Sequence, residues 1–329
     1  MDTLTHGLLG LAIGALRKSD GTKTDRAVLL ATVLAAELPD LDYLWPSDEP
    51  VLVTLRAHRG LSHALIAAPV VALVAAAAAR LVFRRAALLP TYLMALAATV
   101  FGHILCDLWT GWGTRVLLPF SDRRLGLDWT SVLDPLFTLP LLAGAAFALL
   151  RSRRAARTEP RVPGAWRGPL LAGLLVSAAY LGMRVGIRSA LESRVDAHYQ
   201  VDARVFPPPI GVLRWRYVAP LPDGFAAGVV ELGGALTEER RVQADRAALA
   251  AVEALPVGRE VLAWARYPVA THTPRPDGGF TVSVGDLRYH AGGDPTLRFV
   301  LELDANGQML SARLDRGGSF RDLLARWRR

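Results

Sequence analysis

Four long stretches without a charged residue constrain this chain more than any other feature of its sequence. They cover residues 64–79, 86–102, 135–150 and 168–183 and consist mainly of alanine, leucine and valine. A membrane-spanning helix needs about 20 mostly apolar residues, so each stretch approaches membrane length if the flanking arginines extend toward lipid headgroups. We therefore expect helices that cross a membrane. The alternative is a soluble helical bundle with a very apolar core.

Two shorter apolar segments precede the long ones. Gly10 and Gly14, four residues apart on the first, would let this pair approach closely as a helical hairpin. The predicted fold is a polytopic α-helical membrane domain of about 5–6 helical segments, over residues 1–190. The segments are expected at about 3–16, 27–38, 61–83, 88–106, 132–150 and 168–187.

The remaining residues, 195–329, predict a small antiparallel β-rich extramembrane domain. Alternating apolar and polar residues indicate strands at 212–218, 260–266, 280–284 and 297–303, and turn signals occur at 276–279 and 304–307. A helix is expected near 237–254. We interpret His272 and His290 as surface residues near turns, and Trp215 and Trp264 as packing residues.

Basic residues divide the connections between the apolar segments into two sets. Connections 17–26, 80–85 and 151–167 hold 13 Lys and Arg, whereas 39–60 and 107–131 hold 5. The positive-inside rule places the first set in the cytoplasm and the second set, with the β domain, outside. This topology of a multi-pass inner-membrane protein accounts for the net charge of +8. We therefore expect the lipid bilayer as partner and no nucleic acid.

Histidines and aspartates gather at one face of these segments. Successive helices run in opposite directions, so residues at the start of one segment and the end of the next reach the same face. Ionisable residues beside membrane helices are costly, and their gathering indicates function. In chain order they are His6, Asp40, Asp42, His58, His63, His103, Asp107 and Asp134.

These residue types suit a divalent metal. Imidazole nitrogen with carboxylate oxygen favours zinc, with manganese or iron possible, and the i, i+4 spacing of His103 and Asp107 puts both on one helix face. The predicted metal ligands are His6, Asp40, Asp42, His63, His103 and Asp107. The predicted catalytic residues are Asp40, His58 and Asp134. One of Asp40 and Asp42 could bridge two metals while the other orients a histidine. One metal or two both fit, and Asp134 before Pro135 is also typical of a helix N-cap.

Five motifs in order resemble the YdjM-type family over about residues 1–150. They are MDTLTHG (1–7), PDLD (39–42), HRGLSH (58–63), HILCDLWTGWG (103–113) and DP (134–135). Members are described as LexA-binding, inner-membrane-associated, metal-dependent hydrolases, so the resemblance implies a membrane-bound hydrolase. Ala64 replaces the family's usual serine. Two pieces are also distantly similar to zinc-dependent phospholipases C, whose final His and Glu ligands have no counterpart here.

The sequence thus predicts a metal-dependent hydrolase at the outer face of the membrane. Metal-activated water would attack a phosphoester or related ester, and a lipid-linked phosphodiester is the substrate class that this depth suggests. Two other classes stay open. A metal-ion or small-solute transporter would need polar residues through the midplane, where the long segments offer few. A non-enzymatic anchor would carry a structural metal and a partner-binding β domain.

Overall fold

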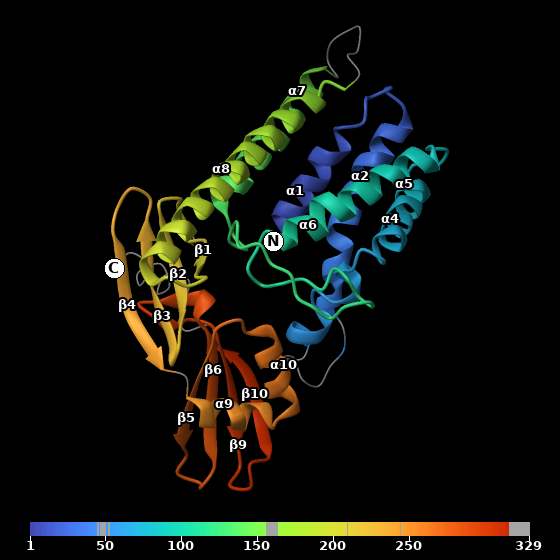
Figure 1. The fold of residues 1–329 in the computed structure, drawn as a ribbon. Coiled ribbons are helices and arrows are strands. Elements are labelled where there is room, and N and C mark those ends of the chain that lie inside the picture. Colours follow the sequence, from blue (N-terminus) through green and yellow to red (C-terminus); the bar gives the residue numbers. More distant parts are fainter. Residues whose placement is uncertain are drawn as a thin grey trace. The chain divides into compact units, whose positions relative to one another are not determined.

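The computed structural model describes residues 1–44, 46, 51, 53–155, 164–208, 210–243 and 245–315. The chain forms two compact units (Figure 1). The first contains Met1–Leu44 and His58–Val185, and the second contains Trp45–Ala57 and Gly186–Arg329. Part of the basic connection 151–167 lies outside the described residues.

The first unit is a helical bundle with short 3-10 and π-helical pieces between its α-helices. Its elements are α1 (Thr3–Gly14), α2 (Lys23–Glu37), η1 (Leu38–Leu44), η3 (Leu61–His63), α4 (Ala68–Val82), α5 (Leu88–Ala97), η4 (Ala98–Ile104), α6 (Leu105–Leu108), α7 (Pro135–Ala155) and the first part of α8 (Arg167–Tyr199). Alanines of α2, α4 and α5 form much of its core. Small side chains let these helices pack closely.

In the part of the chain that the structure describes, three helices are long and apolar enough to cross a membrane: Leu88–Leu108, Pro135–Ala155 and Arg167–Tyr199. A fourth candidate is the pair Val53–His63 and Ala68–Val82, which is bent by 78°. Among the described residues, a count of five or six spans is therefore not confirmed. Helices α1 and α2, of 12 and 15 residues, are too short for a full span.

The glycines of α1 pack as the sequence predicts. A Cβ atom at Gly10 would lie 2.6 Å from the carbonyl oxygen of Thr32 in α2, and one at Gly14 would lie 2.8 Å from the Thr32 hydroxyl. The hairpin of α1 and α2 is confirmed. Gly144 and Gly173 allow the same close approach between α7 and α8, the long pair in Figure 1.

Two predicted helical segments differ in the structure. Segment 61–83 is not one helix, because Ala64 is extended (ψ 144°) after η3 and α4 begins only at Ala68, with Pro69 in its first turn. Segment 168–187 continues to Tyr199. Its extra turns bury Leu191 and Val195, four residues apart, in the core of the second unit.

The described residues of the second unit form two four-stranded antiparallel sheets, a two-stranded hairpin and several short helices. The first sheet has the order β1 (Arg204–Phe206), β2 (Arg214–Leu221), β3 (Gly224–Glu231), β4 (Leu236–Gln243), and the second has the order β10 (Met309–Asp315), β9 (Arg298–Leu303), β6 (Phe280–Asp286), β5 (Pro268–Pro274). The other elements are η2 (Val53–Ala57), α9 (Arg246–Glu253), α10 (Pro256–Trp264), η5 (Leu287–Tyr289) and the hairpin β7 (His290–Ala291) and β8 (Asp294–Pro295). The predicted β-rich architecture is confirmed.

Three predictions within this unit are wrong. Residues 260–266 belong to α10 and not to a strand, because Val257, Val261 and Trp264 form one buried helical face. The predicted helix near 237–254 is correct only for α9, since its first half is β4, a charged strand that pairs with β3 at the sheet edge. His290 is buried, at 1% exposure, whereas His272 is exposed as expected.

Candidate metal centre

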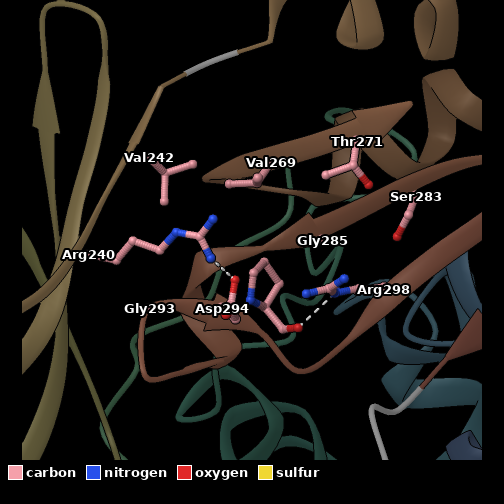
Figure 2. Close-up of a pocket in the computed structure, with 10 residues that line it drawn as sticks. Arg240, Val242, Val269, Thr271, Ser283, Gly285, Gly293, Asp294 and Arg298 are labelled. Carbon is pink, nitrogen blue, oxygen red and sulfur yellow. Dashed lines mark hydrogen bonds and ion pairs between the residues drawn. The ribbon is translucent and has the colours of Figure 1, made fainter. Parts of the chain in front are cut away.

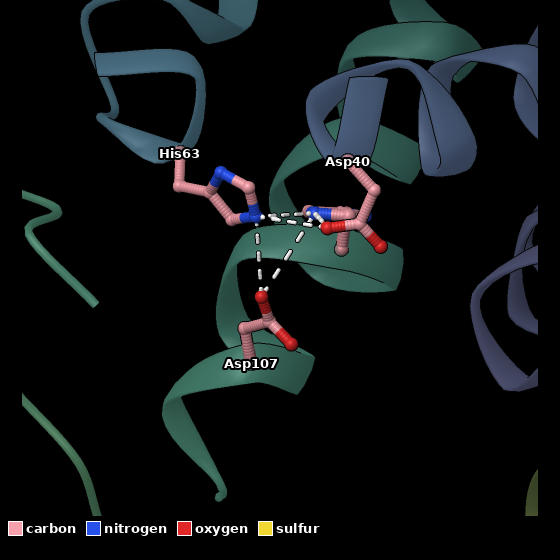
Figure 3. Close-up of side chains that lie close together, drawn as sticks. Asp40, His63 and Asp107 are labelled. Atoms are coloured by element: carbon pink, nitrogen blue, oxygen red, sulfur yellow. Dashed lines mark hydrogen bonds and ion pairs between the residues drawn. The ribbon is translucent and has the colours of Figure 1, made fainter. Parts of the chain in front are cut away.

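Four side chains from four separate elements meet at one point of the helical unit. They are Asp40 of η1, His63 of η3, His103 of η4 and Asp107 of α6, and one ligand atom from each lies within 4.8 Å of all the others. His63 Nε2 is 3.3 Å from both Asp40 Oδ1 and Asp107 Oδ2. Figure 3 shows Asp40, His63 and Asp107 pointing toward one another.

Irregular backbone positions these side chains. His103 lies in η4, a π-helical stretch between α5 and α6, and such stretches are frequent at functional sites. A 3-10 segment after α2 carries Asp40, and the break after η3 frees His63 from the α4 helix. Gly102 packs closely against α1, since a Cβ atom there would lie 3.0 Å from Ile13 Cδ1.

The histidines are held so that one nitrogen of each has its lone pair toward the cluster. His103 Nδ1 donates to the carbonyl oxygen of Ala36 (2.6 Å), and His6 Nδ1 donates to that of Gly102 (2.9 Å). Ser62 Oγ donates to Asp42 Oδ2 (2.7 Å), and therefore accepts from His63 Nδ1 (2.9 Å). Fixing Nδ1 as the donor leaves Nε2 of His63 and of His103 available to bind a metal, whereas Nε2 of His6 hydrogen-bonds the Met1 amino group (3.0 Å).

Electron-rich atoms meet at the centre of the cluster. Nε2 of His63 lies 2.9 Å from Nε2 of His103, so two lone pairs face each other unless a proton or a metal ion lies between them. Asp107 Oδ2 is buried and accepts no hydrogen bond from the described residues, and an unpaired buried carboxylate oxygen is costly. A cation bound between these atoms removes both penalties. The residues present therefore fit a divalent metal with nitrogen and oxygen ligands.

Arg59 determines which carboxylate oxygen of Asp107 is available to bind a metal. Its Nη2 donates to Asp107 Oδ1 (2.8 Å), which the Met1 amino group also contacts, and its Nη1 donates to Thr110 Oγ1 (2.8 Å). The backbone is left-handed at this residue (φ 58°), a costly conformation for a side chain of this size. Sequence reasoning missed Arg59, although it lies between two predicted site histidines.

A second group borders the first. Asp42, His58 and His63 also place ligand atoms within 4.8 Å of one another. Asp42 Oδ1 accepts from His58 Nδ1 (2.9 Å), and Asp42 Oδ2 accepts from Ser62 and from the backbone N–H of Arg59. This aspartate can orient two histidines around one metal, or hold a second metal.

Both aspartates of η1 are ionised at neutral pH. Burial opposes ionisation of Asp40, but the neighbouring imidazoles of His63 and His103 outweigh it and lower the pKa to about 2. Burial also opposes ionisation of Asp42, but hydrogen bonds from His58 and His63 hold its pKa well below the usual range. Two carboxylates that stay charged are suited to binding a cation.

Two predicted site residues, His6 and Asp134, lie outside both groups. The ring of His6 stacks on that of His103, with centroids 4.1 Å apart, and its Nε2 is 3.4 Å from Asp107 Oδ1. Asp134 accepts hydrogen bonds from Thr130 (2.7 Å) and Tyr180 (3.1 Å). Neither Thr130 nor Tyr180 belongs to the cluster. Asp134 also accepts from the backbone of the first turn of α7, and its catalytic role stays a prediction.

A helical unit with membrane-length apolar helices and a buried His/Asp cluster defines a membrane protein with a candidate metal centre. The model of the YdjM inner membrane protein family matches residues 1–191. The chain therefore belongs to this family, which confirms the predicted family and supports a membrane location. It is also similar to the "Uncharacterized protein YfhP" of Bacillus subtilis (strain 168), with 25% identity over 233 residues, or 69% of this chain and 68% of that protein. No solved structure matches the chain.

Proposed function

We propose that this protein is a membrane-bound, metal-dependent hydrolase that acts on a phosphoester or related ester near the membrane surface. The observation that carries the proposal is the convergence of Asp40, His63, His103 and Asp107 within 4.8 Å. These residues would hold a divalent metal, most favourably zinc. When bound, such an ion lowers the pKa of water toward roughly 7 and stabilises negative charge on a reacting oxygen.

One side of the cluster is open to a substrate. The side chain of Asp40 is 17% exposed, whereas those of His63 and Asp107 are at most 1% exposed. Catalytic metal sites keep one position open, in contrast to closed structural sites. Substrate would therefore approach beside Asp40.

His58 is the favoured proton acceptor on this open side. Its Nδ1 lies 4.0 Å from Asp40 Oδ1 and donates a hydrogen bond to Asp42, which orients the ring and leaves Nε2 as the proton acceptor. The ring of Tyr43 stacks on it, with centroids 3.8 Å apart. His58 can thus take a proton from water through Nε2.

Exposed apolar side chains beside the ligands support a substrate carried by lipid. Leu41 lies between the two aspartates of η1, Leu44 ends that element, and Leu61 lies between His58 and His63. These leucines are 55%, 77% and 60% exposed. Acyl chains would cover them at a membrane surface. A lipid-linked phosphodiester is therefore the preferred substrate class.

We also propose a multi-pass topology with the site and the β domain outside the cytoplasm. The uneven division of basic residues, 13 against 5, supports this orientation. Reporter fusions at residues 20 and 315 test it. A reporter active only outside the cytoplasm should work at 315 and fail at 20, and the reverse pattern would contradict the orientation.

Hydrolysis is tested with detergent-purified protein, a chromogenic phosphodiester and a phospholipid. We expect turnover that requires added zinc and is lost in Asp40→Asn, while His272→Asn, at an exposed β5 position, keeps it. Metal uptake into liposomes without hydrolysis would favour a transporter. Bound metal with no turnover, and unfolding of Asp40→Asn, would favour a structural metal in an anchor protein.

A further inference from the structure

A small pocket in the second unit lies between β4, the second sheet and the β7–β8 hairpin (Figure 2). Its volume is about 50 Å³. One enclosed water needs roughly 10–15 Å³ on the same measure, so the pocket has room for a few waters or one small group. The pocket is lined by polar side chains that include Arg240, Thr271, Ser283 and Arg298.

The pocket lies on the polar face of the second sheet. Phe299 of β9 lies on the other face, where its ring contacts Trp264 of α10 at a centroid distance of 5.3 Å. Side chains along a strand alternate between the two faces of a sheet, and paired residues on neighbouring strands share a face. Thr271 pairs with Ser283. Gly285, two residues after Ser283, pairs with Arg298. Thr271, Ser283 and Arg298 therefore share the face opposite Phe299.

Arg298 is fixed in place with its outer nitrogens unused. Its Nε donates to the carbonyl oxygen of Pro295 (2.9 Å), and the described residues provide no partner for its two Nη atoms. In Figure 2 the guanidinium of Arg298 lies beside the pocket, with Arg240 on its far side. Among the described residues, Arg240 pairs with Asp294 alone, through Nη1. The charged residues that line the pocket are thus two arginines and one aspartate, so the net charge of the lining is positive.

Hydroxyl groups add neutral donors to this positive site. Neither Thr271 Oγ1 nor Ser283 Oγ has a hydrogen bond within the described part of the chain. Figure 2 shows both side chains on the strands that line the pocket. Guanidinium and hydroxyl donors together match the oxygens of a phosphate group, which accepts several hydrogen bonds at once.

Two glycines allow the hairpin to close over the sheet. A Cβ atom at Gly285 would lie 2.3 Å from Pro295 Cβ, and one at Gly293, where φ is +76°, would lie 2.3 Å from Arg240 Cβ. No side chain fits at either position. The walls of the pocket thus depend on close backbone packing, which keeps the two arginines in register with the hydroxyls.

We propose that this pocket binds a phosphate group through Arg298 and Arg240, with Ser283 and Thr271 as further donors. The ligand is either free inorganic phosphate or the phosphate of a lipid headgroup. This site is separate from the His/Asp cluster in sequence and does not depend on the hydrolase proposal. It gives the β domain a binding role of its own.

The test is a titration of the detergent-solubilised full chain, treated with EDTA so that metal-bound phosphate does not contribute. Inorganic phosphate is one probe, and phosphatidic acid in mixed micelles is the other. We expect at least one probe to bind at one site per chain, and Arg298→Gln to weaken it at least tenfold. Ser283→Ala should weaken it several-fold.

Arg313→Gln is the matched control, because Arg313 pairs with Val300 on the same sheet face but does not line the pocket. It should bind as the parent does. Binding of both probes identifies phosphate itself as the ligand, and binding of phosphatidic acid alone identifies a lipid headgroup. No binding of either at millimolar concentration, or equal loss in Arg298→Gln and Arg313→Gln, would overturn the proposal.

Discussion

Nε2 of His63 lies 2.9 Å from Nε2 of His103, although the two residues are 40 positions apart in the chain. Each ring uses its Nδ1 as a hydrogen-bond donor, to Ser62 and to the Ala36 carbonyl. Two nitrogens in this state repel unless a proton or a metal lies between them. Metal binding should therefore stabilise the helical unit.

Zinc should raise the melting temperature of the EDTA-treated protein. A ligand at 1,000 times its Kd stabilises the folded state by about 4 kcal/mol. Thermal unfolding in detergent, with and without zinc, measures this effect. The shift should vanish in His63→Ala and persist in His272→Ala, whose side chain is exposed. An equal shift in both variants would show that zinc binds elsewhere.

Arg59→Met should destabilise the protein by about 3–5 kcal/mol, because it leaves the buried Asp107 carboxylate without its guanidinium partner. It should also weaken zinc binding by roughly 10–100-fold, since Asp107 loses its orientation. Chemical unfolding and zinc titration measure the two effects. Arg123→Met, at an exposed position, is the control. Unchanged zinc affinity in Arg59→Met would show that this contact does not position the ligand.

Asp42→Asn distinguishes one metal from two. Both oxygens of Asp42 already accept hydrogen bonds, from His58 and from Ser62. We therefore expect Asp42→Asn to keep about one metal per chain with a roughly 10–100-fold lower affinity, and Asp40→Asn to lose the metal. Elemental analysis measures both. A parent with two metals that falls to one in Asp42→Asn would establish a second metal on Asp42.

Gly10→Ala should separate α1 from α2. Its added Cβ would lie 2.6 Å from the Thr32 carbonyl oxygen, and overpacking of this kind costs about 1–3 kcal/mol. Gly182→Ala in α8, where no atom lies within 4 Å, is the control and should be neutral or slightly stabilising. Thermal unfolding of the two variants in one detergent compares them. Equal stabilities would contradict the close packing of the hairpin.

The β unit should lose stability as the pH falls below about 6.5, the ordinary pKa of a histidine. Burial, with the charge of Arg216, lowers the pKa of His290 and outweighs the attraction of the Glu239 carboxylate, 3.5 Å away. Below the ordinary value the unfolded chain takes up a proton that folded His290 refuses, so protons favour unfolding there. The stabilising effect is complete above that pH and lost as the pH falls toward the folded pKa.

Thermal unfolding followed by tryptophan fluorescence measures this loss of stability. It is recorded about one pH unit above 6.5 and about one pH unit below it. The buried Trp215 and Trp264 report on the β unit. His290→Gln should lose less stability between the two pH values than the parent does. A parent that is equally stable at both would contradict the prediction.

The sequence alone determined the kind of protein. Uncharged apolar stretches predict membrane helices from composition, and the alternation of residues 280–284 and 297–303 predicts β6 and β9, because both patterns are local. It also identified Asp40, His63, His103 and Asp107 as candidate ligands, since charged groups are rare beside membrane helices.

Only the tertiary structure decided the details of the cluster. The π-helical turn at His103, the hydrogen on each histidine Nδ1 and the unpaired Oδ2 of Asp107 depend on contacts with residues distant in the chain. The same holds for β4, whose charged sequence resembles a helix until β3 pairs with it. Local patterns determine which side chains are available, and long-range packing determines which of their atoms meet.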